Sequence, residues 1–247
     1  MNAPSVDIPG EQRLEIPGGG ILYDASRLRK AQPEWFDREY WQRRDALTSM
    51  TGGRGSVSFL RTDNGTWVLR RYLRGGLMAK VSKDRYLWTG ERRTRSFAEW
   101  RLLAELLRRQ LPVPRPVAAR YQRSGLTYSA DLITEEISGA RTLAQSLSSR
   151  SAGQWRAIGG TIARFHREGV QHADLNAHNI LIAPDETIYV LDFDRGRIRD
   201  RGAWEQVVLA RLRRSLEKVS RQRSDAHFNE RNWSALMEGY GGEADSG

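Results

Sequence analysis

One stretch of the sequence constrains the fold more than any other, because it places acids and an amide at fixed intervals. Residues 172–179 read HADLNAHN, and residues 191–194 read LDFD after a short apolar run. Asp174, Asn179 and Asp192 therefore follow one another in the order that phosphoryl transfer needs: a base beside the attacking hydroxyl, then two ligands for Mg²⁺. The sequence predicts that these groups act together on ATP and Mg²⁺.

The spacing also matches a general pattern, H-x-D-L-x-x-x-N followed by D-F-x, which is the signature of protein-kinase-type active sites. A lone H-x-D is weak, since most such pairs are solvated loop residues. Here Asn179 comes five residues after Asp174 and Asp192 follows a predicted hairpin, so the catalytic interpretation is favoured. Asn176 lies inside the same loop and is a further candidate catalytic residue.

Composition narrows the possible partners and excludes several classes of site. The 247 residues suffice for one large domain or two lobes. The absence of cysteine excludes disulfides and cysteine-ligated zinc. A formal charge of +10 indicates an anionic partner: nucleic acid, a phospholipid surface or a phosphorylated substrate. The apolar runs are too short to span a bilayer and the first 20 residues lack a signal-peptide core, so we expect a cytoplasmic protein.

The N-terminal third contains a glycine cluster where a nucleotide-binding loop would stand. Residues 1–20 are rich in Pro and Gly and are interpreted as a flexible lead-in with room for one short strand. Residues 35–41 carry four aromatic side chains at helical spacing, which predicts a helix packed on the body. Residues 51–59 read as a glycine turn between two strands, and backbone N–H groups at Gly53 and Gly55 are candidates for contact with nucleotide phosphates.

The next strand, residues 66–72, lacks the lysine that a kinase places there to hold phosphates. Aligning Trp67-Val68-Leu69-Arg70 with V-A-I-K makes Arg70 the replacement, with Lys80 or Lys83 as the alternative cation. The helix predicted at residues 96–110, with Ser96 as N-cap, carries Glu99. Glu99 either pairs with Arg70 or serves only the helix start, where the dipole favours an acid.

The boundary between the two predicted lobes falls after the strand at residues 128–137. Glu136 lies in this connector, where backbone groups are candidates for binding adenine, so the lobes are 1–137 and 138–247. A strong helix at residues 151–168, ended by Gly169, leads into the catalytic loop. His166, late in that helix, is expected to cap or pack rather than react.

The C-terminal part is basic and helical. Between Arg195 and Arg231 the sequence has eleven Arg or Lys and five Asp or Glu. Apolar residues from Trp204 to Val219 predict an amphipathic helix whose other face is basic. That face either is merely solvated or meets an anionic surface. A last packed helix is expected around residues 228–240.

These motifs in combination resemble one family. Residues 171–181, 192–197, 71–77, 84–90, 111–117 and 209–216 are similar to 3-deoxy-D-manno-octulosonic acid (Kdo) kinases, lipopolysaccharide-core enzymes of the protein-kinase-like superfamily. The resemblance implies ATP-dependent phosphorylation of the 4-hydroxyl of Kdo on a lipid A precursor, by a peripheral protein at the cytoplasmic face of the inner membrane. By motif match it places Asp174 as general base, Asn179 and Asp192 at magnesium, and Glu99 as the helical glutamate.

Three residues depart from the general kinase pattern. Ala173 stands where the loop arginine is usual, which argues against a phosphorylation-gated activation loop. Asp194 replaces the glycine after Phe193, and glycine is the permissive residue in a mobile loop. Arg70 replaces the strand lysine, and a planar guanidinium is not a lysine point charge. Together with Asn176, the missing lysine argues against a protein-serine kinase.

The sequence therefore predicts an α+β, two-lobed protein-kinase-like fold, with an antiparallel-sheet N-lobe and a mainly helical C-lobe. The predicted function is a Kdo kinase using ATP and Mg²⁺. Two alternatives stay open: a kinase of another acceptor (a core heptose, a small-molecule sugar or a protein), and a catalytically dead module that binds nucleotide or nucleic acid. Retention of Asp174, Asn179 and Asp192 disfavours the second, so nucleic acid is not the expected partner.

Overall fold

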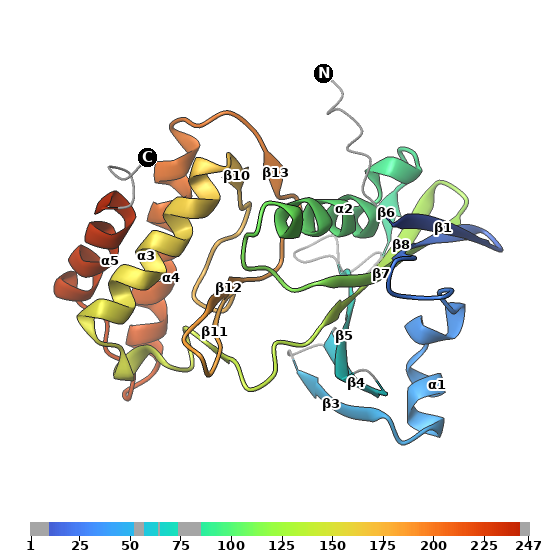
Figure 1. Cartoon of the computed structure of the whole chain (residues 1–247), viewed down its shortest axis with the longest axis horizontal. Coiled ribbons are helices and arrows are strands. Elements are labelled where there is room, and N and C mark those ends of the chain that lie inside the picture. Colours follow the sequence, from blue (N-terminus) through green and yellow to red (C-terminus); the bar gives the residue numbers. More distant parts are fainter. Residues whose placement is uncertain (1–9, 52–56, 64, 74–84, 243–247) are drawn as a thin grey trace. The chain divides into compact units, whose positions relative to one another are not determined.

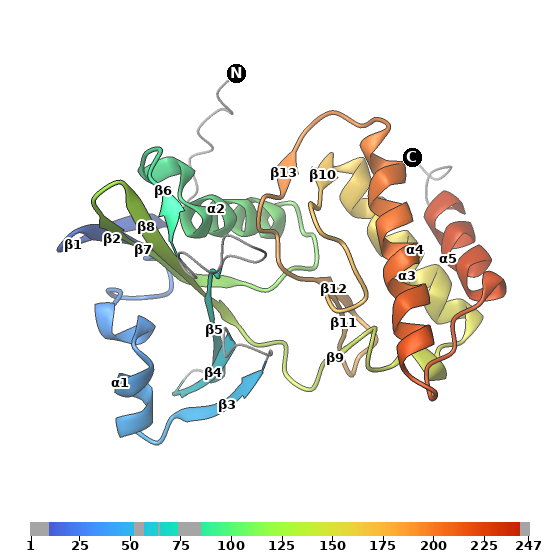
Figure 2. The same ribbon diagram turned by 180° about the vertical axis from the view of Figure 1, so that it is seen from behind.

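The computed structural model describes residues 10–51, 57–63, 65–73 and 85–242. The chain divides into two compact units (Figures 1 and 2): residues 1–108 with 114–136, and residues 109–113 with 137–247. The first unit is built on an antiparallel sheet and the second is mainly helical. The α+β class and the distribution of strands and helices along the chain are as predicted.

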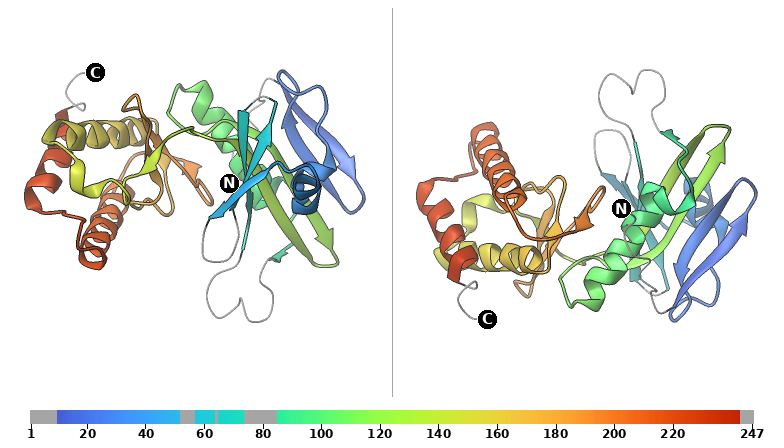
Figure 3. Two further views of the ribbon diagram at one scale, coloured as in Figure 1. Left: turned by 90° about the horizontal axis from the view of Figure 1, so that it is seen from below. Right: turned by 90° about the horizontal axis from the view of Figure 1, so that it is seen from above.

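The first unit holds one continuous sheet among its described residues, with strand order β1-β2-β7-β8-β5-β4-β3 and β6 paired to β8. Helix α2 lies against β7 and β8 (Figure 3). The elements are β1 (Glu11–Ile16), β2 (Gly19–Asp24), η1 (Pro33–Phe36), α1 (Arg38–Arg43), β3 (Leu47–Thr51), β4 (Val57–Thr62), β5 (Gly65–Arg71), β6 (Tyr86–Leu87), η3 (Glu91–Arg93), α2 (Arg95–Arg108), β7 (Pro116–Ser124) and β8 (Thr127–Glu135).

The predicted flexible lead-in is wrong for residues 11–20. These residues form β1 and the start of β2, and β2 also pairs with β7. The glycines that suggested a linker serve the hairpin instead. Gly18 has φ +70°, and a Cβ on Gly19 would lie 2.1 Å from the carbonyl oxygen of Tyr121 on the neighbouring strand. Only glycine fits both positions, one for its backbone and one for close approach.

The aromatic cluster at residues 35–41 packs as predicted, although not on one helix. Trp35 and Phe36 lie in the 3-10 turn η1, and Trp41 lies in α1 after the cap at Asp37. All three are buried in the core of the sheet unit, where the ring centroids of Trp35 and Trp67 are 5.0 Å apart. The other members of this core are Ile16, Ile21, Tyr23, Ala31, Leu60, Leu69, Val117, Ala118 and Ile133.

Helix α2 begins one residue earlier than predicted, and Ser96 is not its N-cap. Thr94 precedes the helix with extended backbone, and its carbonyl accepts the first helical hydrogen bond, from Ala98. Ser96 lies inside the helix, fully buried, and its hydroxyl donates to the carbonyl of Arg120 at 2.8 Å. Both residues are small and hydroxylic, so the sequence alone could not separate a cap from a buried cross-link to the sheet.

The second unit gathers three long helices beside two small sheets, β12-β11-β9 and β10-β13, among its described residues (Figure 2). The elements are β9 (Arg141–Thr142), η4 (Leu147–Ser149), α3 (Ala152–Arg167), β10 (Val170–Gln171), β11 (Ile180–Ile182), β12 (Ile188–Val190), β13 (Arg197–Ile198), α4 (Trp204–Gln222) and α5 (Glu230–Gly242). The predicted hairpin after the catalytic loop and the predicted C-terminal helices are confirmed.

Helix α3 has the predicted limits because both ends carry explicit signals. Ser151 and Gln154 form a capping box, and Gly169, at φ +69°, follows the last turn. His166 packs, as predicted. Its Nδ1 lies 2.8 Å from the Tyr240 hydroxyl, and burial lowers its pKa to about 4. A histidine held neutral inside the helical core is structural.

Helices α3 and α5 approach closely at two glycines. A Cβ on Gly159 would lie 1.9 Å from the carbonyl oxygen of Leu236, and a Cβ on Gly239 would lie 2.0 Å from that of Arg156. Backbone atoms cannot yield as a flexible side chain can, so any larger residue would force the helices apart. This crossing fixes α3, the helix that delivers the chain to the catalytic loop.

Gly159→Ala should therefore destabilise the protein by about 1–3 kcal/mol, the usual cost of overpacking. Gly153→Ala is the matched control on the same helix, because its nearest contact would be Ser151 Oγ at an ordinary 3.8 Å. Alanine there should be neutral or stabilising. Urea unfolding followed by circular dichroism measures both, and equal midpoints for the two variants would contradict the close crossing.

Candidate active site

His172 ties the catalytic loop to the strand end that carries Asp192. Its Nδ1 accepts the Asp174 backbone N–H at 3.0 Å, so the ring proton lies on Nε2, which lies 2.8 Å from the Leu191 carbonyl. The ring is 4 % exposed and its centroid lies 4.8 Å from that of Phe193. One neutral imidazole thus fixes the loop backbone at Asp174 and the backbone just before Asp192.

Two amide side chains shape the loop around the Asp174 carbonyl. Asn176 Nδ2 and Asn179 Nδ2 both donate to that oxygen, at 2.9 and 3.0 Å. Asn176 Oδ1 accepts the His178 N–H at 2.9 Å. The amide of Asn176 is therefore bound at both ends to loop backbone and holds the shape of the loop; a direct part in catalysis stays a prediction.

The loop is also anchored to the rest of the unit at Ala177, which is fully buried. The Ala177 carbonyl accepts the Ala144 N–H at 3.0 Å, and its own N–H donates to Ser215 Oγ on α4 at 3.1 Å. The Asn179 carbonyl accepts the Leu191 N–H at 2.8 Å and so continues the β11–β12 pairing. These bonds leave Asn179 Oδ1 as the atom of that residue suited to a metal.

The backbone around Asp192 is strained at specific residues. Asp192 and Arg195 both have φ +62°, and the Gly196 N–H closes a turn onto the Phe193 carbonyl at 2.7 Å. Asp194 is not among the residues with positive φ. The aspartate that replaces the usual glycine therefore needs no glycine-like backbone in this conformation, and the left-handed backbone lies instead at Asp192 and Arg195.

The donor set suits magnesium. In the described part of the chain, no group of three or more His, Cys, Asp or Glu side chains is placed to hold a metal. Mg²⁺ does not need one, because it usually binds one or two carboxylates and completes its shell with phosphate oxygens and water. The Asp192 carboxylate and Asn179 Oδ1, on backbone joined by the Leu191–Asn179 hydrogen bond, fit that requirement.

In the first unit, the structure brings Arg70 and Glu99 together. The Arg70 guanidinium lies 2.5 Å from Glu99 Oε2, and the Tyr72 hydroxyl donates to the same oxygen at 2.5 Å. Glu99 is 3 % exposed, so its charge is stabilised by these partners and not by solvent. The first turn of α2 contains no acid, which excludes helix-start chemistry as the role of Glu99.

The neighbouring arginine on β5 does something else. Arg71 pairs with Asp131 at 3.0 Å, and Asp131 is also held by Arg120 at 2.8 Å within the sheet. Alternation along the strand therefore sends Arg70 toward α2 and Arg71 toward the sheet network, which supports Arg70 as the cation of the predicted site. Gly53, Gly55, Lys80 and Lys83 lie outside the described residues.

Glu136, predicted to meet adenine, has its N–H in use. It donates to the Thr66 carbonyl at 2.9 Å, and the Glu135 N–H donates to the Arg115 carbonyl at 2.9 Å. The start of the connector is thus tied to the sheet. Of the two backbone groups of Glu136, the N–H is therefore already engaged, and the carbonyl is the one suited to contact a nucleotide.

One residue beside the loop was missed by the sequence analysis. Arg211, on α4, forms an ion pair with the Asp174 carboxylate. The only signal in the sequence was a basic helix, and its periodicity could not show which cation reaches a loop 37 residues away.

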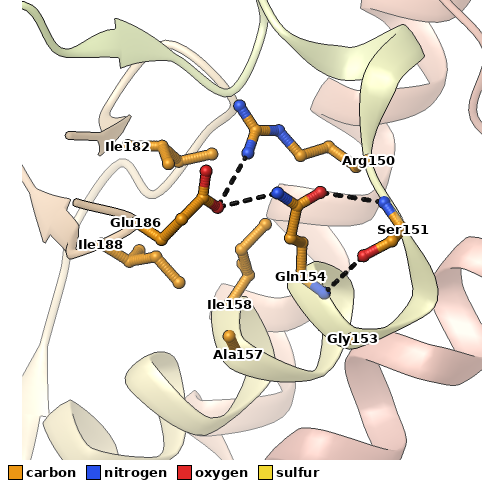
Figure 4. A pocket seen from close by; sticks show the side chains of 9 residues that line it. All are labelled: Arg150, Ser151, Gly153, Gln154, Ala157, Ile158, Ile182, Glu186 and Ile188. Atoms are coloured by element: carbon orange, nitrogen blue, oxygen red, sulfur yellow. Dashed lines mark hydrogen bonds and ion pairs between the residues drawn. The ribbon is translucent and has the colours of Figure 1, made fainter. Parts of the chain in front are cut away.

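A separate cavity of about 220 Å³ lies at the start of α3 (Figure 4). Its floor is apolar, from Ile158, Ile182 and Ile188, and Glu186 on its rim accepts from Gln154 at 2.8 Å. None of the predicted site residues lines it.

Over the residues that the structure describes, no helix has the length and apolarity to cross a bilayer.

Within the second unit, the hydrogen-bonded loop that carries Asp174 and Asn179, followed by Asp192, is the arrangement typical of a kinase-type phosphotransferase. The particular family follows from comparison: the chain belongs to the Lipopolysaccharide kinase (Kdo/WaaP) family, whose model matches residues 38–240. The predicted family is confirmed.

Curated relatives are highly similar. A 3-deoxy-D-manno-octulosonic acid kinase of Stenotrophomonas maltophilia (strain R551-3) is 50% identical over 208 residues, which cover 83% of each chain. The enzyme of the same name from Xanthomonas axonopodis pv. citri (strain 306) is also 50% identical over 208 residues, with the same coverage. Among solved structures, the Cydia pomonella granulovirus kinase PK-1 aligns with TM-score 0.43 and 13% identity, over 67% of this chain and 58% of that one. At that TM-score the alignment supports no conclusion about this chain.

If Arg70 and Glu99 act as one unit on ATP, Arg70→Ala and Glu99→Ala should raise the KM for ATP to a similar degree. The double variant should show a coupling of about 1–3 kcal/mol between the two sites. Arg71→Ala is the control, since its ion pair with Asp131 belongs to the sheet. Steady-state kinetics with varied ATP measure the KM of each variant. The assignment would be rejected if the effects of the two single substitutions simply add in the double variant, or if Arg71→Ala raises the KM for ATP equally.

Proposed function

We propose that this protein transfers the γ-phosphoryl group of ATP to the 4-hydroxyl of a Kdo residue on Kdo-lipid A, in lipopolysaccharide core biosynthesis. The observation that carries the proposal is the 50% identity to curated Kdo kinases over 83% of the chain. The site geometry supports it, because Asp174 stands on a loop fixed by His172, Asn176 and Asn179.

The proposed reaction is a direct displacement at the γ-phosphorus. The 4-oxygen of Kdo forms a bond to phosphorus, the bond from phosphorus to the bridging oxygen breaks, and ADP leaves. Asp174 takes the proton of the hydroxyl and positions its oxygen. Asn179 and Asp192 hold Mg²⁺, which neutralises phosphate charge when bound. Asn176 keeps the Asp174 backbone in place.

The remaining predicted residues serve the nucleotide. We assign Arg70 to the α- and β-phosphates, with Glu99 orienting its guanidinium, and backbone at Gly53 and Gly55 to the phosphates as well. The Glu136 carbonyl is assigned to adenine. In this scheme residues 1–137 form the nucleotide lobe, and residues 138–247 form the lobe with the catalytic loop.

We further propose that the protein binds peripherally at the cytoplasmic face of the inner membrane, where its acceptor is anchored. The support is a row of exposed cations on α4, namely Arg214, Lys218 and Arg221. Glu217 lies near two arginines of the same helix, Arg213 at 3.1 Å and Arg221 at 4.0 Å, and Arg213 also donates to Glu230. Nucleic acid is not an expected partner, because a module that only binds nucleic acid needs no general-base carboxylate such as Asp174.

Wild-type protein with ATP and Mg²⁺ should add the mass of one phosphate to Kdo-lipid A. Asp174→Ala should lose turnover on the order of 10²–10⁴-fold while still binding nucleotide, because general-base catalysis and positioning are lost together. Mass spectrometry of the product and nucleotide titration measure the two effects. Turnover of Asp174→Ala close to that of wild type would remove Asp174 from the mechanism.

Asp192→Asn should weaken Mg²⁺-dependent ATP binding more than Asn179→Ala does. The first variant loses a full negative charge at the metal, whereas the second loses only an amide oxygen. Magnesium titrations of ATP binding compare the two. Curves for both variants that coincide with the wild-type curve would refute the metal assignment.

Changing Arg214, Lys218 and Arg221 together to Gln should reduce binding to anionic vesicles about tenfold or more, since each cation near such a surface adds roughly 1 kcal/mol. A control triple, Arg29, Lys30 and Arg43 to Gln, removes the same charges from exposed positions in the first unit. Vesicle sedimentation at low salt tests both. Equal losses in the two triples, or equal binding to neutral vesicles, would show that α4 is not the docking face.

A further inference from the structure

The positively charged guanidinium of Arg211 lies beside the proposed catalytic base, Asp174, and packing of α4 fixes the backbone that carries it. Leu212 and Leu216 on the same helix are fully buried, and Ser215 bonds to the loop at Ala177. Helix α4 and the catalytic loop are thus joined one turn from Arg211. The ion pair itself is open to solvent, with the Arg211 side chain 48% and the Asp174 side chain 60% exposed.

This ion pair adds little stability and occupies the carboxylate of the proposed base. Exposed ion pairs contribute little to folding, typically under 1 kcal/mol. While Arg211 is paired with the Asp174 carboxylate, that carboxylate is not available to an acceptor hydroxyl. The arrangement therefore suits a cation whose partner in the reacting complex is a different anion.

The proposed acceptor carries such an anion at a suitable place. Its name, an octulosonic acid deoxygenated at C3, puts a carboxylate at C1 of the same sugar whose C4 bears the reacting hydroxyl. The carboxyl carbon and C4 are separated by only two ring carbons. A 4-hydroxyl seated on Asp174 therefore brings the carboxylate within reach of a group that already contacts Asp174. A planar guanidinium matches a carboxylate with two parallel hydrogen bonds.

We propose that Arg211 is the receptor for the acceptor's carboxylate. Without acceptor, Asp174 occupies the guanidinium. When Kdo binds, its carboxylate takes Arg211 and its 4-hydroxyl takes the place at Asp174, which releases the base as the substrate arrives. The inference rests on the proposed function and adds a source of selectivity: a heptose has no carboxylate and leaves Arg211 paired to Asp174.

The test uses two water-soluble acceptors without acyl chains, the methyl glycoside of Kdo and its C1 carboxamide. Wild type should prefer the carboxylate in kcat/KM by about 10- to 100-fold, the value of one charged hydrogen-bonded pair. Arg211→Gln should remove the preference by raising the KM for the carboxylate acceptor. Arg211→Lys, which keeps the charge without the fork, should retain part of the preference.

Arg156→Gln is the matched control. Arg156 forms a similarly exposed ion pair, with Glu238 at 2.8 Å, on α3 of the same unit. This variant should keep the full preference. Calorimetry of the glycoside without ATP adds a readout independent of turnover: binding should be lost in Arg211→Gln and kept in Arg156→Gln.

Three outcomes would overturn the inference. They are a wild type that does not distinguish the two acceptors, an Arg211→Gln variant that keeps the preference, and a fall in kcat that is the same for both acceptors. The last would mean that Arg211 only positions the loop. If wild type phosphorylates neither the glycoside nor Kdo-lipid A, the proposed function itself fails, and the inference fails with it.

Discussion

The imidazole of His172 joins the two segments that carry Asp174 and Asp192. His172 accepts a hydrogen bond from the backbone that carries Asp174 and donates one to the backbone that precedes Asp192. Both bonds need the neutral ring with its proton on Nε2. The ring lies against Phe193, which in turn stacks on Phe165 of α3 at 5.8 Å. The backbone at Asp174, the backbone just before Asp192 and the helical core are therefore linked through one buried side chain.

The packing of the helices supports this imidazole and the loop that it holds. The capping box at Ser151 and the glycine at 169 mark the two ends of α3. The glycines at 159 and 239 allow α3 and α5 to approach closely where they cross. Helix α4 adds the bond from Ser215 to the loop. The loop is further held by Asn176 and Asn179, whose amides both donate to the Asp174 carbonyl. Such support is what preorganised catalysis requires, because loose positioning is costly to rate.

Much of this was predictable because the deciding signals are local. Aligning residues 67–70 with V-A-I-K predicted Arg70 as a partner of Glu99, which the ion pair confirms, and the helical pattern with Ser151 and Gly169 predicted the limits of α3. The misses share a physical cause. Glycines 18 and 19 read as a linker because a tight hairpin and a flexible segment use the same residue, and only the neighbouring strand at Tyr121 separates them. Arg211 was missed because its contact with Asp174 depends on tertiary packing of α4, which no spacing rule encodes.

If the proposed function holds, phosphate is transferred to one oxygen of one sugar, the 4-oxygen of Kdo. Nuclear magnetic resonance of the purified product locates that oxygen directly, through the coupling between phosphorus and the sugar protons. A phosphorus coupling to the proton at C4 of Kdo is the predicted result. A coupling to a heptose proton, or to any other position of Kdo, would contradict the account.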